Sequence, residues 1–496
     1  MAMPRRWRNL LGALAHLLAA ACTSPASAHG FGQRYDLPIP LSFYVWGAGA
    51  TVALSFVGFA LFLRPEHGLL RTETKFHPKG RLVNAVVLSA RALAVGMLAL
   101  VIVAGFFGNQ DPIRNIAPVM IWIIFWVGLT VVSLLIGDLW AVINPWKTIF
   151  MVSESFYRCV RPDAVLGLGR RYPEWLSVWL AFLLFVLFAW MELVWSGKSV
   201  PAQLAAALLV YSGITWLGMF VFGRETWLKH GEVFTLVFGT FARFAPFARI
   251  RDGQTGICLR PPAVGLLEDR PLAVSMVALV IALLATVTFD GFLETPLWAQ
   301  VDRAVLDMAS EADSPFWVVL NLREDQAVQL VRTFALLGCI LLFMAAYAVV
   351  CWCTAAVSGV HETSTAIVGR RFVLTLVPIS LAYHVAHYFS YLFGGGQYAI
   401  PLLSDPLGHG WNLFGTAGYQ VDIGLITPRL QWTVAVLAVV LGHVIAVYLS
   451  HVTALQVFRS RRATLFSQIP MVLLMVGYTM LSLWILSQPI VETASG

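Results

Sequence analysis

Long apolar runs, nearly free of charged residues, recur along the whole chain. An α-helix of about 20 residues crosses the roughly 30 Å hydrocarbon core of a bilayer, and each run is about that long. The pattern therefore predicts ten membrane-spanning helices, at residues 41–63, 82–106, 116–137, 173–195, 203–222, 271–289, 330–356, 372–393, 431–457 and 466–487.

One further apolar segment, residues 232–247, does not fit this series. It is too short to cross a bilayer as a helix, and basic stretches flank it on both sides. We therefore interpret it as an interfacial or re-entrant helix.

The composition agrees with a membrane protein and excludes a soluble enzyme. Of the 496 residues, 59% are hydrophobic and 12% are charged, whereas about a quarter of the residues are charged in soluble domains. No internal repeat or low-complexity linker divides the chain. We predict an all-α, polytopic membrane helix bundle in which residues 29–496 form a single domain.

The N-terminus has the pattern of an export signal. Residues 4–8 are basic, residues 9–21 are apolar, and the small residues 26–28 resemble a cleavage site. Residues 1–28 are therefore predicted to be a cleaved signal peptide, with the mature chain starting outside the cytoplasm at His29. An overlapping alternative is a lipoprotein site at Cys22.

Basic residues test this orientation independently, because Lys and Arg concentrate in cytoplasmic loops. With the start outside, the basic loops after the first, third, fifth, seventh and ninth helices are all cytoplasmic, whereas residues 107–115 and 196–202 are poor in basic residues. Ten spans then leave both termini outside.

The net charge of +7 comes from these loops rather than from a basic, aromatic-rich stripe, so we expect the bilayer as partner and not a nucleic acid. The oligomeric state is left open.

Histidines inside the apolar runs are the first candidates for chemistry, because an ionisable side chain at membrane depth is costly and often functional. His384 and His387 are three residues apart and share one helix face. His443 falls near mid-membrane on the next helix. The three residues can converge on a divalent metal, zinc or copper. The alternative is that they hydrogen-bond between helices.

A second polar cluster is predicted near the cytoplasmic end of the same helices. His451 lies about 12 Å further along its helix than His443 and reaches the level of His361 and Glu362. Asp138 is a further candidate for this cluster. Asp138 and Glu192 both lie near helix ends, where helix capping or snorkelling also explains them.

The loop at residues 394–430, rich in Gly and aromatic residues, offers Asp405 and His409 at the outer face. Asp290 and Glu294 add carboxylate oxygens there. His29, once it is the first residue, has an amine and a ring nitrogen that together can chelate copper. The alternative for the loop is a polar segment that closes the bundle.

Several familiar catalytic patterns are missing. The sequence has no Walker loop, no G-x-S-x-G elbow, no H-E-x-x-H and no C-x-x-C-H haem attachment. These absences argue against ATP hydrolysis and serine-esterase chemistry.

Longer motifs carry a family resemblance that covers residues 29 to about 460. They are H-G-F-G-Q-R-Y-D-L-P at 29–38, G-N-Q-D-P-I-R-N-I-A-P at 108–118, G-D-L-W-A-V-I-N-P-W at 137–146, A-Y-H-V-A-H-Y at 382–388, L-L-S-D-P-L-G-H-G-W-N-L-F-G-T-A-G-Y at 402–419 and G-H-V-I-A-V-Y-L-S-H at 442–451. Together they resemble the fenitrothion hydrolase family of bacterial multi-pass membrane proteins.

The resemblance implies hydrolysis of a phosphorothioate triester, with release of a nitrophenol, at the bacterial inner membrane. The substrate would be a small apolar organophosphate. In such a reaction, the metal held by the three mid-membrane histidines would activate water. Asp405 or His409 would accept the proton, and Tyr383 would orient the site. The alternative is a copper transporter or a b-haem electron-transfer subunit that uses the same histidines.

Overall fold

The computed structural model describes residues 35–62, 74–77, 80–162, 164–250, 256–268, 270–310, 323–358, 364–458 and 460–490. Within these ranges, ten helices are long and apolar enough to cross a membrane. They are α2 (Leu41–Phe62), α3 (Arg81–Phe107), the run of α4, η1 and α5 (Ile116–Pro118, Val119–Gly128, Leu129–Leu135), η2 with α8 (Glu174–Leu176, Trp179–Leu193), α9 (Pro201–Phe222), α12 (Val274–Leu293), α15 (Glu324–Ser358), the run of α16, η5 and α17 (Thr365–Phe372, Val373–Leu376, Val377–Phe393), α19 (Pro428–Val457) and α20 (Arg461–Ser487). The predicted all-α bundle is confirmed.

Shorter elements connect the spans. They are α6 (Trp140–Ile143), α7 (Pro145–Val160), η3 (Ser196–Ser199), α10 (Arg224–His230), α11 (Val233–Phe241), η4 (Val264–Leu266), α13 (Pro296–Ser310), η6 (Gly395–Tyr398), α18 (Ala399–Ser404) and η7 (Ile423–Leu425). Strands β1 (Thr74–Phe76), β2 (Phe247–Arg249) and β3 (Ile257–Leu259) form a small antiparallel sheet in the order β1-β3-β2, in which Cys258 pairs with both Lys75 and Ala248.

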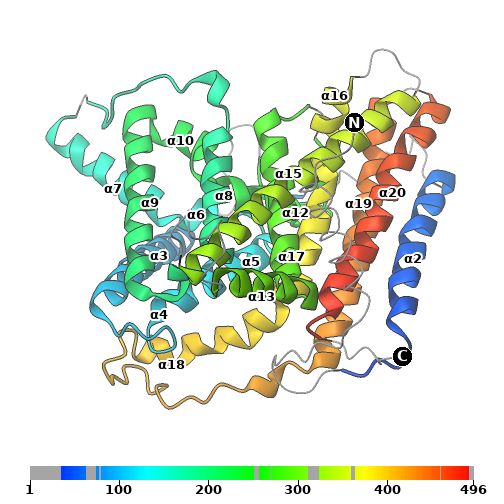
Figure 1. Ribbon diagram of the computed structural model, residues 1–496. Coiled ribbons are helices and arrows are strands. Elements are labelled where there is room, and N and C mark those ends of the chain that lie inside the picture. The colour runs from blue at the N-terminus through cyan, green and yellow to red at the C-terminus, as the bar shows by residue number, and fades with distance from the viewer. Residues whose placement is uncertain are drawn as a thin grey trace, which may run out of the picture.

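The spans lie side by side in one bundle (Figure 1). At one end of the view α2 packs against α19 and α20, and at the other end α3 packs against α9. The most extensive helix pair is α17 with α19. These two helices meet at Gly442, where a Cβ atom would lie 2.3 Å from the Cβ of Ala382 and 2.8 Å from the carbonyl oxygen of Pro378. A small residue at this position lets the two backbones approach closely.

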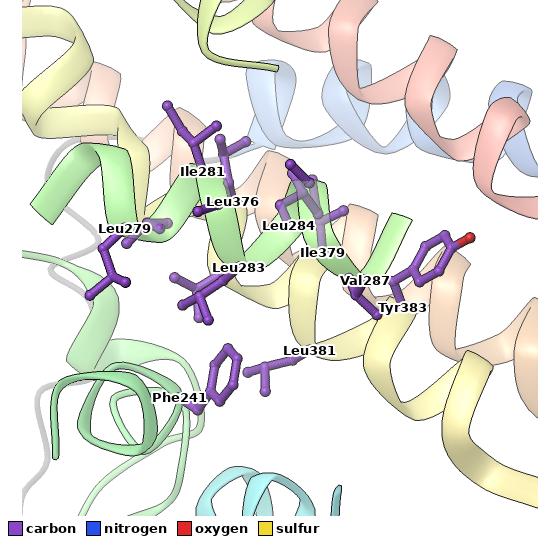
Figure 2. Packing of buried hydrophobic residues seen from close by; sticks show 14 of the residues in the cluster. Phe241, Leu279, Ile281, Leu283, Leu284, Val287, Leu376, Ile379, Leu381 and Tyr383 are labelled. Carbon is purple, nitrogen blue, oxygen red and sulfur yellow. The ribbon is translucent and has the colours of Figure 1, made fainter. Parts of the chain in front are cut away.

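Helix α12 is the centre of the bundle, because most of its side chains are buried on every face. It packs against α8, α15 and α17. Figure 2 shows Leu283 of α12 next to Leu381 of α17 and Phe241 of α11 in the main hydrophobic core. A polar side chain on α12 is therefore surrounded by protein rather than by lipid.

Three spanning runs depart from a regular α-helix, and one of them is the run that begins with the 3₁₀ turn η2 before α8. Ten residues of the third span, Val119–Gly128, form a π-helix, and Val373–Leu376 form a 3₁₀ turn between α16 and α17. Pro378 follows that turn at the start of α17. Mid-helix π and 3₁₀ segments are frequent at functional sites.

The short apolar segment at residues 232–247 is packed into the bundle. It forms α11, where Val237, Phe238 and Phe241 are fully buried against α5, α8 and α17. Glu232, with no exposed surface, caps this helix by accepting the N–H groups of Phe234 and Thr235.

Candidate functional site

An ion pair lies inside the bundle between α12 and α17. The Nε2 atom of His387 is 3.0 Å from the Oδ2 atom of Asp290, and the two side chains are 7% and 20% exposed. A charge removed from water is stable only when it is paired and hydrogen-bonded. Asp290 is thus the partner that holds His387 in the bundle.

Tyr388 joins this pair to a second carboxylate. Its hydroxyl donates to Oδ2 of Asp290 at 2.5 Å and lies 3.4 Å from Oε1 of Glu192 on α8. Two carboxylates near each other repel when both are ionised. A hydroxyl donor between them, together with the imidazole on one side, compensates for that repulsion.

A small cavity adjoins this group of side chains. His384, Glu192 and Tyr388 are among its lining residues, and Trp126, Phe241, Leu283, Thr286 and Val287 complete the wall. Its free space is that of a water-sized molecule. The cavity thus has polar groups on one wall and apolar side chains on the other.

Besides Trp126, whose buried Nε1 atom has no hydrogen-bond partner among the described residues, His384 is a cavity residue with unused hydrogen-bonding capacity. Its side chain is 3% exposed, and its Nε2 atom has no hydrogen-bond partner among the described residues. The ring meets the edge of Trp126 at 5.5 Å between centroids and that of Tyr388 at 4.6 Å. A buried nitrogen without a partner can bind a water or ligand, and the Nε2 atoms of His443 and His451 are also buried without a partner among the described residues.

The three histidines predicted to bind metal do not converge. His443 faces α20 instead: its Nδ1 is 2.8 Å from the backbone oxygen of Val439, and its ring is 5.8 Å from that of Tyr478 on α20. In the part of the chain that the structure describes, no three His, Cys, Asp or Glu side chains form a group able to hold a metal ion. The donors thus do not fit a divalent metal, and we assign no chemical step to one.

Asp405 and His409 stabilise the loop that follows α18. The two carboxylate oxygens of Asp405 accept the backbone N–H groups of His409 and Gly410 at 2.9 and 2.7 Å, and the exposed His409 ring packs against Trp411. The predicted proton acceptor therefore has a geometry typical of a turn.

Tyr383 is fully buried next to the ion pair, but it faces away from the cavity wall. Its ring is 6.2 Å from His387 and 6.5 Å from Tyr478, and its hydroxyl has no partner among the described residues. It is a packing neighbour of His387, and its predicted orienting role stays a prediction.

Only part of the second predicted cluster lies within the described residues. His451 is buried, and its Nδ1 lies 3.0 Å from Oε1 of Gln468 on α20, whereas Asp138 accepts the N–H of Ala141. His361 and Glu362 lie outside the described residues, as do His29 and the predicted signal peptide at residues 1–28.

Trp126 and Tyr388 are site residues that the sequence interpretation missed, and Glu192 was named there only as a residue near a helix end. Glu192 lies one residue before the end of α8, so capping or snorkelling explained it equally well. Trp126 is one of 18 tryptophans, and most of these are expected at the membrane interfaces. The useful signal was the isolated carboxylate in the otherwise apolar stretch A-W-M-E-L-V-W.

Comparison with known proteins adds no further constraint. No family model matches the chain, and no curated protein or solved structure is significantly similar to it.

Proposed function

We propose that this protein is a membrane-embedded hydrolase of small apolar phosphoric triesters, including phosphorothioates such as fenitrothion, in the bacterial inner membrane. One observation carries the proposal: a water-sized cavity lined by His384 and Glu192 adjoins the Asp290–His387 pair. The motif resemblance supplies the substrate class.

In the proposed reaction, a water molecule in the cavity attacks phosphorus. His384 accepts one proton of that water, since an imidazole with a free ring nitrogen is suited to general-base catalysis. The new P–O bond forms as the bond from phosphorus to the aryl oxygen breaks. The nitrophenol leaves as a phenolate, so no strong general acid is needed.

The other side chains position the cavity residues. Asp290, which pairs with His387, accepts a hydrogen bond from the Tyr388 hydroxyl, and that hydroxyl also contacts Glu192. The cavity has room for the attacking water only, so the proposal requires the apolar triester, which partitions into the bilayer, to approach the cavity wall from the membrane.

The test is nitrophenol release from fenitrothion by purified protein in detergent. We expect His384→Ala to lower kcat by at least about 100-fold, the usual contribution of a general base, and Asp290→Asn to lower it as well. His409→Ala is the matched control and should leave the rate unchanged. Equal rates for wild type and His384→Ala would contradict the site, and no turnover by folded wild type would contradict the function.

A second candidate, a transporter, is favoured by the interrupted span. The 3₁₀ turn at Val373–Leu376 precedes the helix that carries both site histidines, and discontinuous spans are typical of transporter binding sites. In this case the Asp290–His387 pair would carry a proton. Acidification of proteoliposomes coupled to substrate uptake, without nitrophenol release, would support this function.

A further inference from the structure

Helix α7 lies outside the spanning bundle and has three distinct faces. It projects sideways from the bundle beside α9 (Figure 1) and packs against α3 and α9. Trp146 and Phe150 are buried on the bundle side. The other two faces of the helix are free to meet a different environment.

One free face of α7 is apolar and exposed. Val152, Phe156 and Val160 are 64%, 73% and 67% exposed, and their spacing of four residues places them along one side of the helix. In water this stripe would be unfavourable, because it exposes apolar surface without a partner. It is suited to the boundary between lipid headgroups and acyl chains.

The opposite face of α7 carries one exposed arginine, and three more follow the helix. The exposed side chains there are Arg158, Arg161, Arg170 and Arg171. Glu154, the acidic residue of α7, already forms an ion pair with Arg224. The four arginines thus have no carboxylate partner in the described part of the chain, and their charge is available to an anionic surface.

We propose that α7 is an interfacial helix that binds anionic phospholipids, with Val152, Phe156 and Val160 inserted at the acyl boundary and Arg158 and Arg161 at the headgroups. An anionic leaflet, not another protein, fits this arrangement because the apolar stripe is narrow and the charge is of one sign. The proposal does not depend on the enzymatic function.

The chain itself provides a reporter. Cys159 is exposed on α7 and lies on the side of the apolar stripe. The other five of the six cysteines are replaced by alanine, and Cys159 carries a fluorophore. The full-length protein is then reconstituted in phosphatidylcholine vesicles, with brominated phosphatidylcholine or brominated phosphatidylglycerol as the quencher.

We expect both quenchers to act, and phosphatidylglycerol to act more strongly at low salt. Each basic residue near an anionic leaflet strengthens binding about fivefold, so R158E combined with R161E should abolish the excess quenching by phosphatidylglycerol. High salt should reduce this excess too. The matched control is R461E with R462E, which changes two exposed arginines at the start of α20. This variant should retain the excess quenching by phosphatidylglycerol.

Three results would overturn the proposal. Equal quenching by the two lipids would exclude anionic selectivity, and no quenching by either would place α7 in water. Quenching that R158E with R161E leaves unchanged would assign the selectivity elsewhere. If the charge-reversed protein does not fold, F156S in the same assay replaces it and should weaken quenching by both lipids.

Discussion

Two buried carboxylates of this protein differ in how completely they are hydrogen-bonded. Glu232 accepts the N–H groups of Phe234 and Thr235, the hydroxyl of Tyr211 at 2.5 Å, and the side-chain N–H groups of Trp140 and Asn144 at 3.3 Å. Among the described residues, Glu192 accepts one hydrogen bond, from the Tyr388 hydroxyl at 3.4 Å, and it lines a cavity. A saturated carboxylate stabilises the fold, whereas an unsaturated one remains able to bind.

Replacement of Glu232 by Gln should therefore destabilise the protein. The amide would bring an NH₂ group against N–H and O–H donors, and the cost of leaving buried donors unpaired is about 2–5 kcal/mol. Unfolding in mixed micelles measures the loss. Glu225→Gln is the control, because the Glu225 side chain is 77% exposed. Equal stability of the two variants would contradict the structural role of Glu232.

Asp138 gives a pH-dependent prediction outside the spanning helices. Partial burial raises its pKa above 3.8, although the hydrogen bond from Ala141 and the charges of Arg249 and Lys147 oppose the shift. The folded state then binds the proton more tightly than the unfolded state, so this residue's contribution to stability decreases as the pH rises from 3.8 through the folded pKa.

We expect Asp138→Asn to remove this dependence. The variant, measured against wild type in mixed micelles, should gain relative stability as the pH is raised from 3.8, and the difference should level off above the folded pKa. An unchanged difference, or one of opposite sign, would show that the carboxyl is not disfavoured by burial.

The sequence identified some residues of the site but not how they combine. Counting residues along an apolar run gives the depth of each residue in the membrane. This depth identified His384 and His387 as candidates. Which histidines face each other depends on the rotation of each helix about its axis. Gly442 brings α19 against α17, so the adjacent His443 turns toward α20. The partner of His387 proved to be Asp290, 97 residues away in the sequence.

At the scale of elements, hydropathy predicted the spans well and their irregularities not at all. The run 203–222 corresponds to α9, which begins at Pro201, and the run 372–393 corresponds to a helix that begins at Thr365. The π-helix of Val119–Gly128 is as apolar as an α-helix. Its hydrogen-bond register depends on tertiary packing, so the pattern of apolar residues in the sequence does not predict it.

Alanine substitution should change stability in opposite directions at two glycines, one at the close contact of α17 with α19 and one away from it. Gly442→Ala should destabilise the protein by about 1–3 kcal/mol, because its new methyl group would overlap Ala382. Gly338→Ala on α15 has open space around the new Cβ and should stabilise the helix by up to about 1 kcal/mol. Parallel unfolding measurements decide it, and stabilisation by both substitutions would refute tight packing at Gly442.

At the scale of the whole molecule, the site lies nearer one face of the bundle than the other. His387 is six residues before the end of α17 at Phe393, about 9 Å along the axis, and Asp290 is three residues before the end of α12 at Leu293. The loop at residues 394–430 begins at the same face. The first and last described residues also meet, since the N–H of Tyr35 donates to the carbonyl oxygen of Ile490 at 3.0 Å.

The distribution of basic residues predicts that this face is periplasmic, so the site should exchange water and products with the periplasm. In spheroplasts, a membrane-impermeant maleimide should label Leu413→Cys, a residue 60% exposed in that loop, in a background without other cysteines. Cys159 alone, on the basic side, should react only after permeabilisation. The reverse pattern would place the site on the cytoplasmic side and the arginines of α7 in the periplasm, and it would contradict the proposed orientation of the whole bundle.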